Sequence, residues 1–224
     1  MSSSSPTETN PAVIAAVEAG GTFVRVCICH AISTDPTVAL PTIVERTEMD
    51  HSSHDTTPAQ TLEQCAAFLR QHKPAEGYHA LGIASFGPLG VQEGTADYGK
   101  ILPSSPKASW RNVDLLTPLK EACQGSTPLQ IKVETDVNAP AFAEYSLAKK
   151  EQLEGSKSLS SLAYITVGTG VGVGLVVNHL PVHGRMHPEA GHVPVQPLAG
   201  DDFAGYSWGA TCPFQGKHTV EGLA

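Results

Sequence analysis

Hydrophobic and polar positions alternate along this chain with two different periods. Short apolar runs bounded by glycine, proline or polar residues predict strands, and apolar residues that recur every three or four positions predict helices. The predicted strands are residues 13–17, 23–28, 37–48, 80–85, 129–135, 162–165 and 175–177, and the predicted helices are residues 58–72, 115–122 and 139–153. Strands and helices that alternate in this way predict an α/β fold.

Glycine-rich turns separate predicted strands at two distant places. The first is Glu18-Ala-Gly-Gly-Thr22, and the second is the run from Thr166 to Gly174, which has glycine at every second position from Gly168. Glycines let a ligand approach the main chain closely, and the exposed N–H groups of such a turn can bind an anion. The pair therefore predicts a phosphate chain held from two sides, although an ordinary tight hairpin is an alternative for the first turn taken by itself.

Other glycine-rich and metal motifs do not fit. The second turn lacks the last glycine of G-x-G-x-x-G, because Val173 stands there, so a Rossmann dinucleotide site is disfavoured. Residues 94–100 nearly match a P-loop, but Ile101 replaces the hydroxyl side chain that reaches magnesium. His187-Pro-Glu189 fits the H-x-E of zinc deaminases, yet the P-C-x-x-C partner is missing.

Asp136 follows the predicted strand 129–135 and lies between the two glycine turns in sequence. A carboxylate at the end of a strand that opens a helix is often a simple helix cap. It is also well placed to accept the proton of a sugar hydroxyl that attacks a γ-phosphoryl group. Asn138 is expected either to cap the helix or to orient Asp136.

Histidine and cysteine gather toward the end of the chain. His192, Cys212 and His218 could supply three zinc ligands, and packing residues are the equal alternative. The other cysteines are scattered, and an odd total of five does not indicate a secreted disulfide framework. We therefore expect a reducing, cytoplasmic setting.

Bulk properties exclude two classes of partner. The net charge of −8 opposes nucleic-acid binding. The chain of 224 residues has no apolar run of about 18 residues, so no membrane span is expected. Residues 1–10 are rich in serine and lack a basic region, and they predict a disordered leader.

Together these segments resemble the ROK family of sugar kinases, and most closely its bacterial-type fructokinase branch. The matching stretches are residues 18–22, 83–88, 106–110, 135–139, 164–170, 187–192, 201–205 and 221–224. The resemblance implies an actin/hexokinase-like (ribonuclease H-like) two-lobe ATPase fold with an incomplete second lobe, because family members continue past Ala224. The expected N-terminal lobe is residues 11–137, and the expected partial C-terminal lobe is residues 138–224.

The resemblance also implies a nucleotide site with ATP and Mg²⁺. Asp136 matches the catalytic base, and Glu18 matches the acidic residue near the metal-bound phosphates. The residues that match the two phosphate loops are Gly20, Gly21 and Thr22 in the first and Gly168, Thr169, Gly170 and Gly172 in the second.

A sugar site and a structural zinc are implied in the same way. Glu189 and His192 match the family's sugar-binding pair, and Gly87, Pro88 and Asn138 are expected near the sugar. Zinc is in doubt, because Gln215 stands where one ligand is expected and His218 replaces a cysteine, which leaves His192, Cys212 and His218.

The expected activity is the ATP-dependent phosphorylation of a hexose, most simply D-fructose to fructose 6-phosphate. The alternatives are an inactive sugar-binding remnant and a kinase for glucose, mannose or an N-acetylhexosamine. A sugar-responsive repressor is not expected, because the ten-residue leader is shorter than a DNA-binding helix-turn-helix. The expected partners are a sugar and ATP, without nucleic acid or membrane, and a homodimer is left open.

Overall fold

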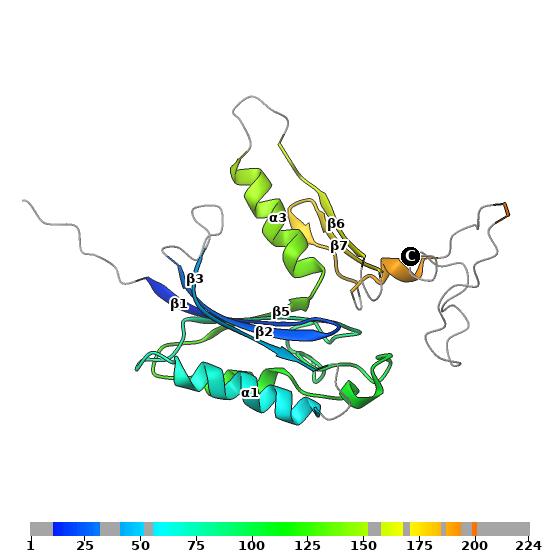
Figure 1. Cartoon of the computed structure of the whole chain (residues 1–224). Helices are drawn as coiled ribbons and strands as arrows, with labels where there is room; N and C mark the ends of the chain where they lie inside the picture. Colours follow the sequence, from blue (N-terminus) through cyan, green and yellow to red (C-terminus); the bar gives the residue numbers. More distant parts are fainter. Residues whose placement is uncertain are drawn as a thin grey trace, which may run out of the picture.

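The computed structural model describes residues 11–31, 41–51, 56–151, 158–167, 171–184, 187–193 and 199–200. These residues form a five-stranded sheet and a three-stranded sheet. Helices α1 and α2 cover one face of the larger sheet, and the smaller sheet lies beyond α3 on the opposite side (Figure 1). This mixed architecture confirms the predicted α/β class.

The five-stranded sheet brings three strand ends to one edge. Its strands are β1 (Ala12–Ala19), β2 (Phe23–Ala31), β3 (Thr42–Asp50), β4 (Ala80–Ser85) and β5 (Gln130–Thr135), in the order β3-β2-β1-β4-β5. Strands β1 to β3 are antiparallel neighbours, whereas β4 runs parallel to β1 and β5 parallel to β4. Because Ala19 pairs with Ser85 and Ser85 with Thr135, the residues that follow β1, β4 and β5 lie side by side.

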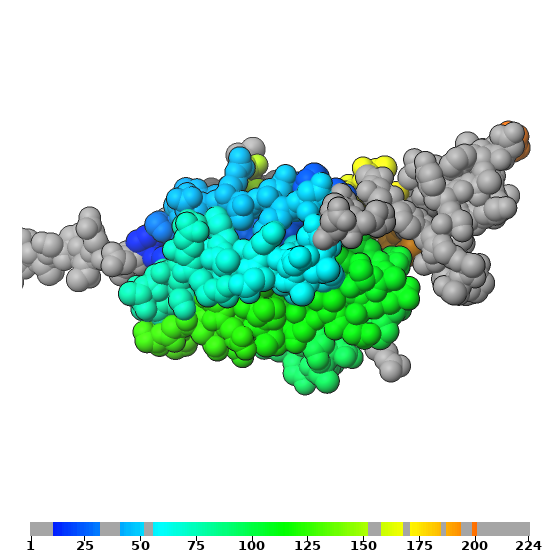
Figure 2. Space-filling model, turned by 60° about the horizontal axis from the view of Figure 1, so that its bottom comes forward, coloured from blue at the N-terminus to red at the C-terminus, as the bar shows by residue number. Residues whose placement is uncertain are grey.

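Helix α1 (Pro58–Gln71) begins at a capping box and buries one face. The Gln60 N–H donates to Thr57 Oγ1 (3.3 Å), and the Thr57 N–H donates to Gln60 Oε1 (2.9 Å), which satisfies two N-terminal donors. Its buried residues, Thr61, Leu62, Cys65, Ala66 and Leu69, recur at the helical spacing. Helix α2 (Leu116–Cys123) packs beside α1, and the two form a continuous surface below the sheet (Figure 2).

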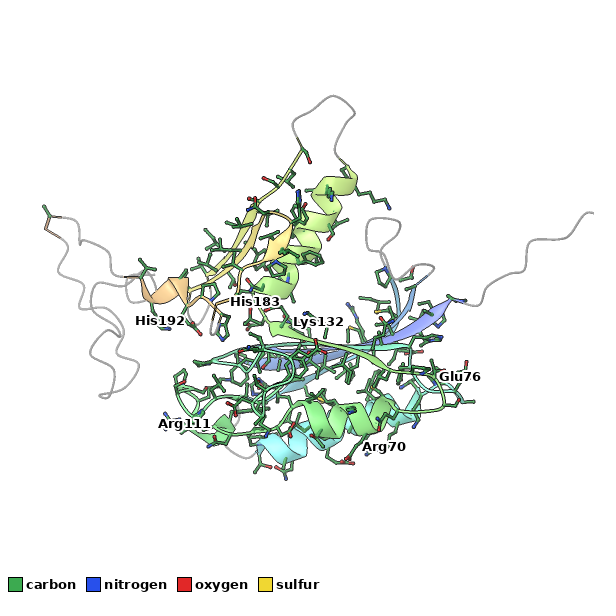
Figure 3. The ribbon with its side chains drawn as sticks, turned by 180° about the vertical axis from the view of Figure 1, so that it is seen from behind. Arg70, Glu76, Arg111, Lys132, His183 and His192 are labelled. Atoms are coloured by element: carbon green, nitrogen blue, oxygen red, sulfur yellow. The ribbon has the colours of Figure 1, made fainter. Side chains whose placement is uncertain are left out.

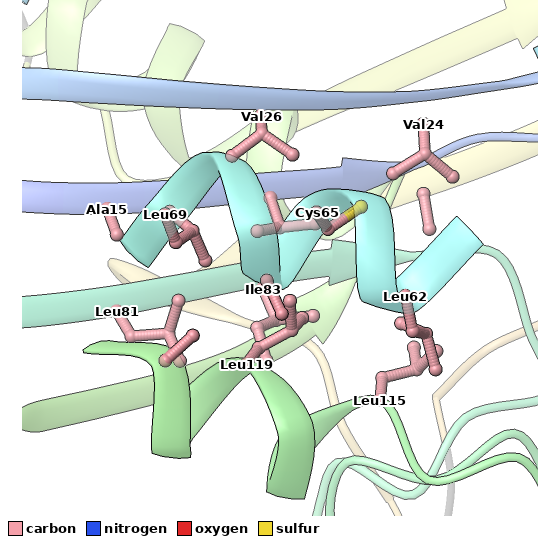
Figure 4. Packing of buried hydrophobic residues seen from close by; sticks show 14 of the residues in the cluster. Ala15, Val24, Val26, Leu62, Cys65, Leu69, Leu81, Ile83, Leu115 and Leu119 are labelled. Carbon is pink, nitrogen blue, oxygen red and sulfur yellow. The ribbon is translucent and has the colours of Figure 1, made fainter. Parts of the chain in front are cut away.

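The hydrophobic core lies between this helix layer and the sheet (Figure 4). Alternate strand positions supply it, because side chains at every second residue share a face of a sheet. The largest fully buried side chains of this cluster are Val24, Val26, Leu69, Tyr78, Leu81, Leu89, Ile101, Leu115, Leu119 and Val133. This rigid layer supports the strand ends that carry the candidate site.

The upper layer is built on helix α3 (Asn138–Lys150). Strands β6 (Leu162–Val167), β7 (Val171–Val177) and β8 (Leu180–Pro181) form an antiparallel sheet in that order, and α3 packs against β6 and β7. A smaller cluster of buried residues, Ala141, Tyr145 and Val176, joins the helix to this sheet. Whether the two layers are separate lobes divided at residue 137 stays a prediction.

The glycines of β7 correct one interpretation of the sequence. Residues 166–174 were expected to form one glycine turn, but Thr166 belongs to β6 and Val171–Gly174 belong to β7. A Cβ added at Gly174 would lie 2.0 Å from the Val137 carbonyl oxygen, and one at Gly172 would lie 2.6 Å from Val137 Cγ1. These two glycines therefore allow the start of α3 to approach the sheet closely.

Smaller differences concern the ends of elements. Helix α3 ends at Lys150 rather than at Leu153, and the short strand β8 and the single-turn helices η1 (Ala108–Trp110) and η2 (Ala190–His192) carry no clear sequence period. Ile165, Val167 and Leu180 of the smaller sheet are 63%, 68% and 68% exposed. Within the described ranges, none of the helices is both long and apolar enough to cross a membrane.

Candidate active site

Asp136 stands at the edge where the parallel strands end. Its main-chain N–H donates to the Ser85 carbonyl (2.9 Å), which ties it to the end of β4. The N-cap of α3 is Val137, without a side-chain capping bond, and Thr135 Oγ1 accepts the Asn138 N–H (3.0 Å) instead. The alternative that Asp136 is a helix cap is therefore wrong.

The surroundings of Asp136 keep its carboxyl protonated to a higher pH than usual. Burial is the largest cause, and together with the negative charges of Glu18 and Glu189 it raises the pKa of this carboxyl from 3.8 to about 6. A backbone hydrogen bond and the nearby Lys107 ammonium act in the opposite direction. The predicted catalytic and binding carboxylates thus lie within electrostatic reach of one another, although they come from distant parts of the sequence.

The first glycine turn, Gly20–Thr22, opens directly from β1. Its hairpin is closed by the Gly20 N–H, which donates to the Phe23 carbonyl (2.9 Å). A Cβ added at Gly21 would meet no atom within 4 Å, so the main chain there is open to a ligand. The turn can therefore receive an anion, as the sequence predicts.

Glu18 forms an ion pair with a neighbouring cation. Its Oε2 lies 3.2 Å from Arg25 Nη1, and the Arg25 Nε donates to Glu48 Oε2 (2.5 Å). The three side chains are about half exposed, so the pairs hold Glu18 weakly. Its carboxylate can therefore reorient toward a metal ion without a large loss of energy.

Glu189 lies between two histidines. His187 Nδ1 is 3.6 Å from Glu189 Oε1, and His192 Nε2 is 3.8 Å from Glu189 Oε2. The His187 side chain is 4% exposed, and its Nε2 accepts the Leu89 N–H (3.1 Å). Because Nε2 accepts, a neutral ring carries its hydrogen on Nδ1, which faces Glu189. No sequence pattern indicates this link between Leu89 and His187.

The segment after β4 is joined to His187. The Gly87–Pro88 peptide is cis, and Ser105 Oγ donates to the Gly87 carbonyl (3.3 Å). A Cβ at Gly87 would lie 2.8 Å from the His187 ring atoms Cε1 and Nε2. The two segments predicted to bind the sugar, residues 87–88 and 189–192, are therefore in contact through this histidine.

Asn138 makes structural contacts. It is 1% exposed, its Nδ2 donates to the Val182 carbonyl (3.1 Å), and its Oδ1 accepts the Leu175 N–H (3.0 Å). Both ends of the amide are thus bound to the main chain around β7. The described contacts give Asn138 the role of holding α3 to the smaller sheet, and its role as a sugar ligand stays a prediction without geometric support.

A second contact between the layers was missed by sequence reasoning. Glu134 Oε2 lies 2.6 Å from His183 Nε2, and Glu134 Oε1 accepts the Thr135 N–H (2.9 Å). The Glu134 side chain is only 8% exposed. Figure 3 shows His183 between the upper layer and the five-stranded sheet. The pair connects the end of β5 to the segment that leads to Glu189.

A cavity of about 740 Å³ lies on the upper face of the five-stranded sheet. Small residues of β1 and β4 line it, together with Glu18, Glu134 and Ala139 of α3, but Asp136 does not. We place the candidate reaction centre at the strand ends beside this cavity, because the carboxylates, the glycine turn and Lys107 meet there.

Several predicted residues lie outside the described ranges. These are Gly168, Thr169 and Gly170 of the second phosphate loop and the zinc candidates Cys212 and His218. Across the residues that the structure describes, no group of three or more His, Cys, Asp or Glu side chains could hold a metal ion. A zinc site therefore stays a prediction.

Two curated relatives of this chain are named fructokinases. The chain is 37% identical over 172 residues to a fructokinase of Zymomonas mobilis, covering 75% of this chain and 52% of that protein. It is 33% identical over 213 residues to a fructokinase of Pediococcus pentosaceus, covering 95% of this chain and 62% of that protein. The chain thus spans between half and two thirds of the length of these relatives.

Solved structures show the fold. A ROK family glucokinase from Streptomyces griseus in complex with glucose and AMPPNP matches with a TM-score of 0.57 and 21% identity, covering 83% of this chain and 51% of that one. A ROK hexokinase from Thermus thermophilus matches with a TM-score of 0.58 and 20% identity, covering 95% and 60%. The family model described as "ROK family" matches residues 14–224. The chain therefore belongs to the ROK family and has its actin/hexokinase-like fold.

Proposed function

We propose that this chain carries the sugar site and part of the nucleotide site of an ATP-dependent hexose kinase, and that its substrate is D-fructose, converted to fructose 6-phosphate. The observation that supports this most directly is the meeting of Asp136, the Gly20–Thr22 turn and Glu189 at one edge of the sheet. Fructose is favoured because the relatives from Zymomonas mobilis and Pediococcus pentosaceus are named fructokinases.

Asp136 is the proposed general base. With a pKa of about 6 it is ionised near neutral pH, yet basic enough to accept a hydroxyl proton as the oxygen attacks the γ-phosphoryl group. The proton moves to a carboxylate oxygen of Asp136, the sugar oxygen bonds to the γ-phosphorus, and ADP leaves as the bond between that phosphorus and the bridging oxygen breaks. Glu189, positioned by His187, binds sugar hydroxyls and fixes the reacting one near Asp136.

The Gly20–Thr22 turn binds phosphate oxygens through main-chain N–H groups. Glu18 and Asp136 present carboxylate oxygens, which are the ligands that Mg²⁺ prefers, so the described residues fit a magnesium nucleotide. Glu18 and Asp136 would hold the Mg²⁺ of the nucleotide, and the ion would supply positive charge against the negative charge that develops during transfer. It would also relieve the repulsion that Glu18 exerts on Asp136.

The first experiment is a coupled assay of ADP release by the purified 224-residue chain. Fructose, glucose, mannose and an N-acetylhexosamine are each offered with Mg²⁺-ATP. Turnover with fructose that exceeds turnover with the other sugars would support the proposal, and Asp136→Asn should lower it about 10²- to 10⁴-fold. Calorimetric titration of fructose should give nearly the same affinity for both proteins, because the base acts in the transition state.

The contrary outcomes identify the alternatives. Preference for another hexose would replace fructose and keep the kinase. Hexose binding without turnover, from soluble folded protein, would favour an inactive sugar-binding remnant. Near-normal turnover by Asp136→Asn would show that Asp136 is not the general base. Zinc and a homodimer are separate expectations, tested by metal analysis and by light scattering of the same sample.

A further inference from the structure

We propose that His51 and Lys107 are positioning residues that hold the carbonyls of the Gly20–Thr22 turn and thereby aim its N–H groups at a nucleotide phosphate. This inference rests on the proposed function and adds to it two residues outside the glycine motif. Neither is part of the turn, and they reach it from 31 and 86 residues away in the sequence.

Three consecutive carbonyls of the turn accept hydrogen bonds from His51 or Lys107. His51 Nε2 is 3.0 Å from the Gly20 carbonyl oxygen, the Lys107 ammonium donates to the Gly21 carbonyl, and the His51 N–H donates to the Thr22 carbonyl (3.1 Å). Since Gly20 O is an acceptor only, the His51 ring must carry its hydrogen on Nε2. The three bonds fix the orientation of three successive peptide planes.

Because the peptide bond is planar, the direction of each carbonyl also sets the direction of the N–H group in the same plane. In a trans peptide the N–H points away from the carbonyl of the same plane. The carbonyls of Gly20 and Gly21 face His51 and Lys107, so the N–H groups of Gly21 and Thr22 face the opposite side. Adjacent N–H groups aimed in one direction form an anion-binding concavity.

Both positioning side chains are themselves held. The His51 ring lies 6.2 Å from the Phe86 ring in a stacked arrangement and 5.1 Å from Trp110 at an edge. The Lys107 ammonium lies 4.5 Å from the centre of the Phe86 ring. Burial lowers the pKa of His51, and the Lys107 charge lowers it further, so the ring stays neutral and keeps one donor. Among the described residues its Nδ1 is buried without a hydrogen-bond partner, and Nε2 makes the hydrogen bond to Gly20.

Four variants distinguish hydrogen-bond donation to a turn carbonyl from direct attraction of phosphate by a positive charge. Lys107→Gln keeps an N–H donor for Gly21 but removes the charge, whereas Lys107→Met removes both and keeps the stem over Phe86. His51→Gln keeps a donor for Gly20, and His51→Met does not. Lys120→Gln and His30→Gln, at exposed positions on α2 and β2, are matched controls.

The readout is the affinity of the full chain for Mg²⁺-ADP, measured by calorimetry beside the affinity for fructose. We expect His51→Met and Lys107→Met each to weaken ADP binding about tenfold, which corresponds to the loss of one hydrogen bond between a turn N–H and the charged phosphate. Both glutamine variants should bind ADP with an affinity within about threefold of that of the parent chain. Fructose affinity should change little in any of them. Equal losses for Lys107→Gln and Lys107→Met would overturn the role of Lys107, because the charge itself would then bind phosphate.

A second readout does not need nucleotide binding. In ¹⁵N spectra of the ligand-free chain, the Gly21 and Thr22 amide signals should shift in the two methionine variants and stay near their original positions in the glutamine variants. Unchanged signals in all four would overturn the proposal. If the parent chain binds no Mg²⁺-ADP while these shifts occur as expected, the proposed function fails and the positioning of the turn stands.

Discussion

Asp136 shows at the scale of one residue how a functional group opposes stability. The folded chain holds this carboxyl in a place that favours its neutral form, with a pKa of about 6 rather than 3.8. Below about pH 3 the carboxyl is protonated in the folded and unfolded chains alike and has no effect. Between about pH 4 and 6 the unfolded chain releases this proton while the folded chain keeps it, so stability falls across this window and the loss is complete above about pH 6.

Asp136→Asn should therefore stabilise the chain above neutral pH. At about 1.36 kcal/mol for each pKa unit, the gain approaches about 3 kcal/mol near pH 8 and disappears below about pH 3. Urea unfolding of both proteins across this range measures it. Asp97→Asn, at an exposed position, should change stability little at either end of the range. A variant less stable than the parent at pH 8 would contradict the burial of Asp136.

The pKa of Asp136 should also respond to its neighbours with opposite signs. Glu18→Gln removes a negative charge and should lower this pKa, whereas Lys107→Met removes a positive charge and should raise it. A ¹³C carboxyl titration of each variant gives the value without an activity assay. Shifts in the same direction for both would mean that their charges do not act on Asp136 as described.

At the scale of elements, the join between α3 and β7 depends on an absent side chain. A Cβ at Gly174 would overlap the Val137 carbonyl, which is main chain and cannot turn aside. Gly174→Ala should therefore destabilise the chain by about 1–3 kcal/mol, the usual range for overpacking. Gly82→Ala is the matched control, because a Cβ there would meet nothing within 4 Å and alanine is favoured over glycine within a strand. Chemical denaturation should show a lower free energy of unfolding for Gly174→Ala and a higher one for Gly82→Ala. Equal changes in the two variants would contradict the close approach of α3 to β7.

The same join shows what the sequence could and could not predict. Apolar periodicity located most helices and strands, because burial on one face leaves a repeating pattern. It could not distinguish a glycine that admits a ligand from one that admits a helix, since both appear as glycine at alternate positions. The strand ends also predicted Asp136, whereas His51, His187 and the Glu134–His183 pair depend on tertiary contacts between residues distant in sequence.

At the scale of the whole molecule, polar contacts among the described residues link the two layers. Glu134 and His183 form one of them, and removing either partner leaves the other partly buried without its bond. A double-mutant cycle with Glu134→Gln and His183→Gln should give a coupling energy of about 1–2 kcal/mol in unfolding experiments. The exposed pair Glu63–Arg70 on α1 is the control, and it should couple by less than about 1 kcal/mol. Coupling near zero for Glu134 and His183 would mean that the layers are held together elsewhere.

The contact between Gly87 and the His187 ring has a consequence for natural variation. Any residue larger than glycine at position 87 would collide with that ring, so the two positions cannot drift independently. Among descendants of a common ancestor, a histidine at 187 should be inherited together with glycine at 87. Lineages that lose the histidine should be the ones in which small residues other than glycine appear at position 87, because the Leu89 main chain, 3.1 Å from such a Cβ, still restricts it.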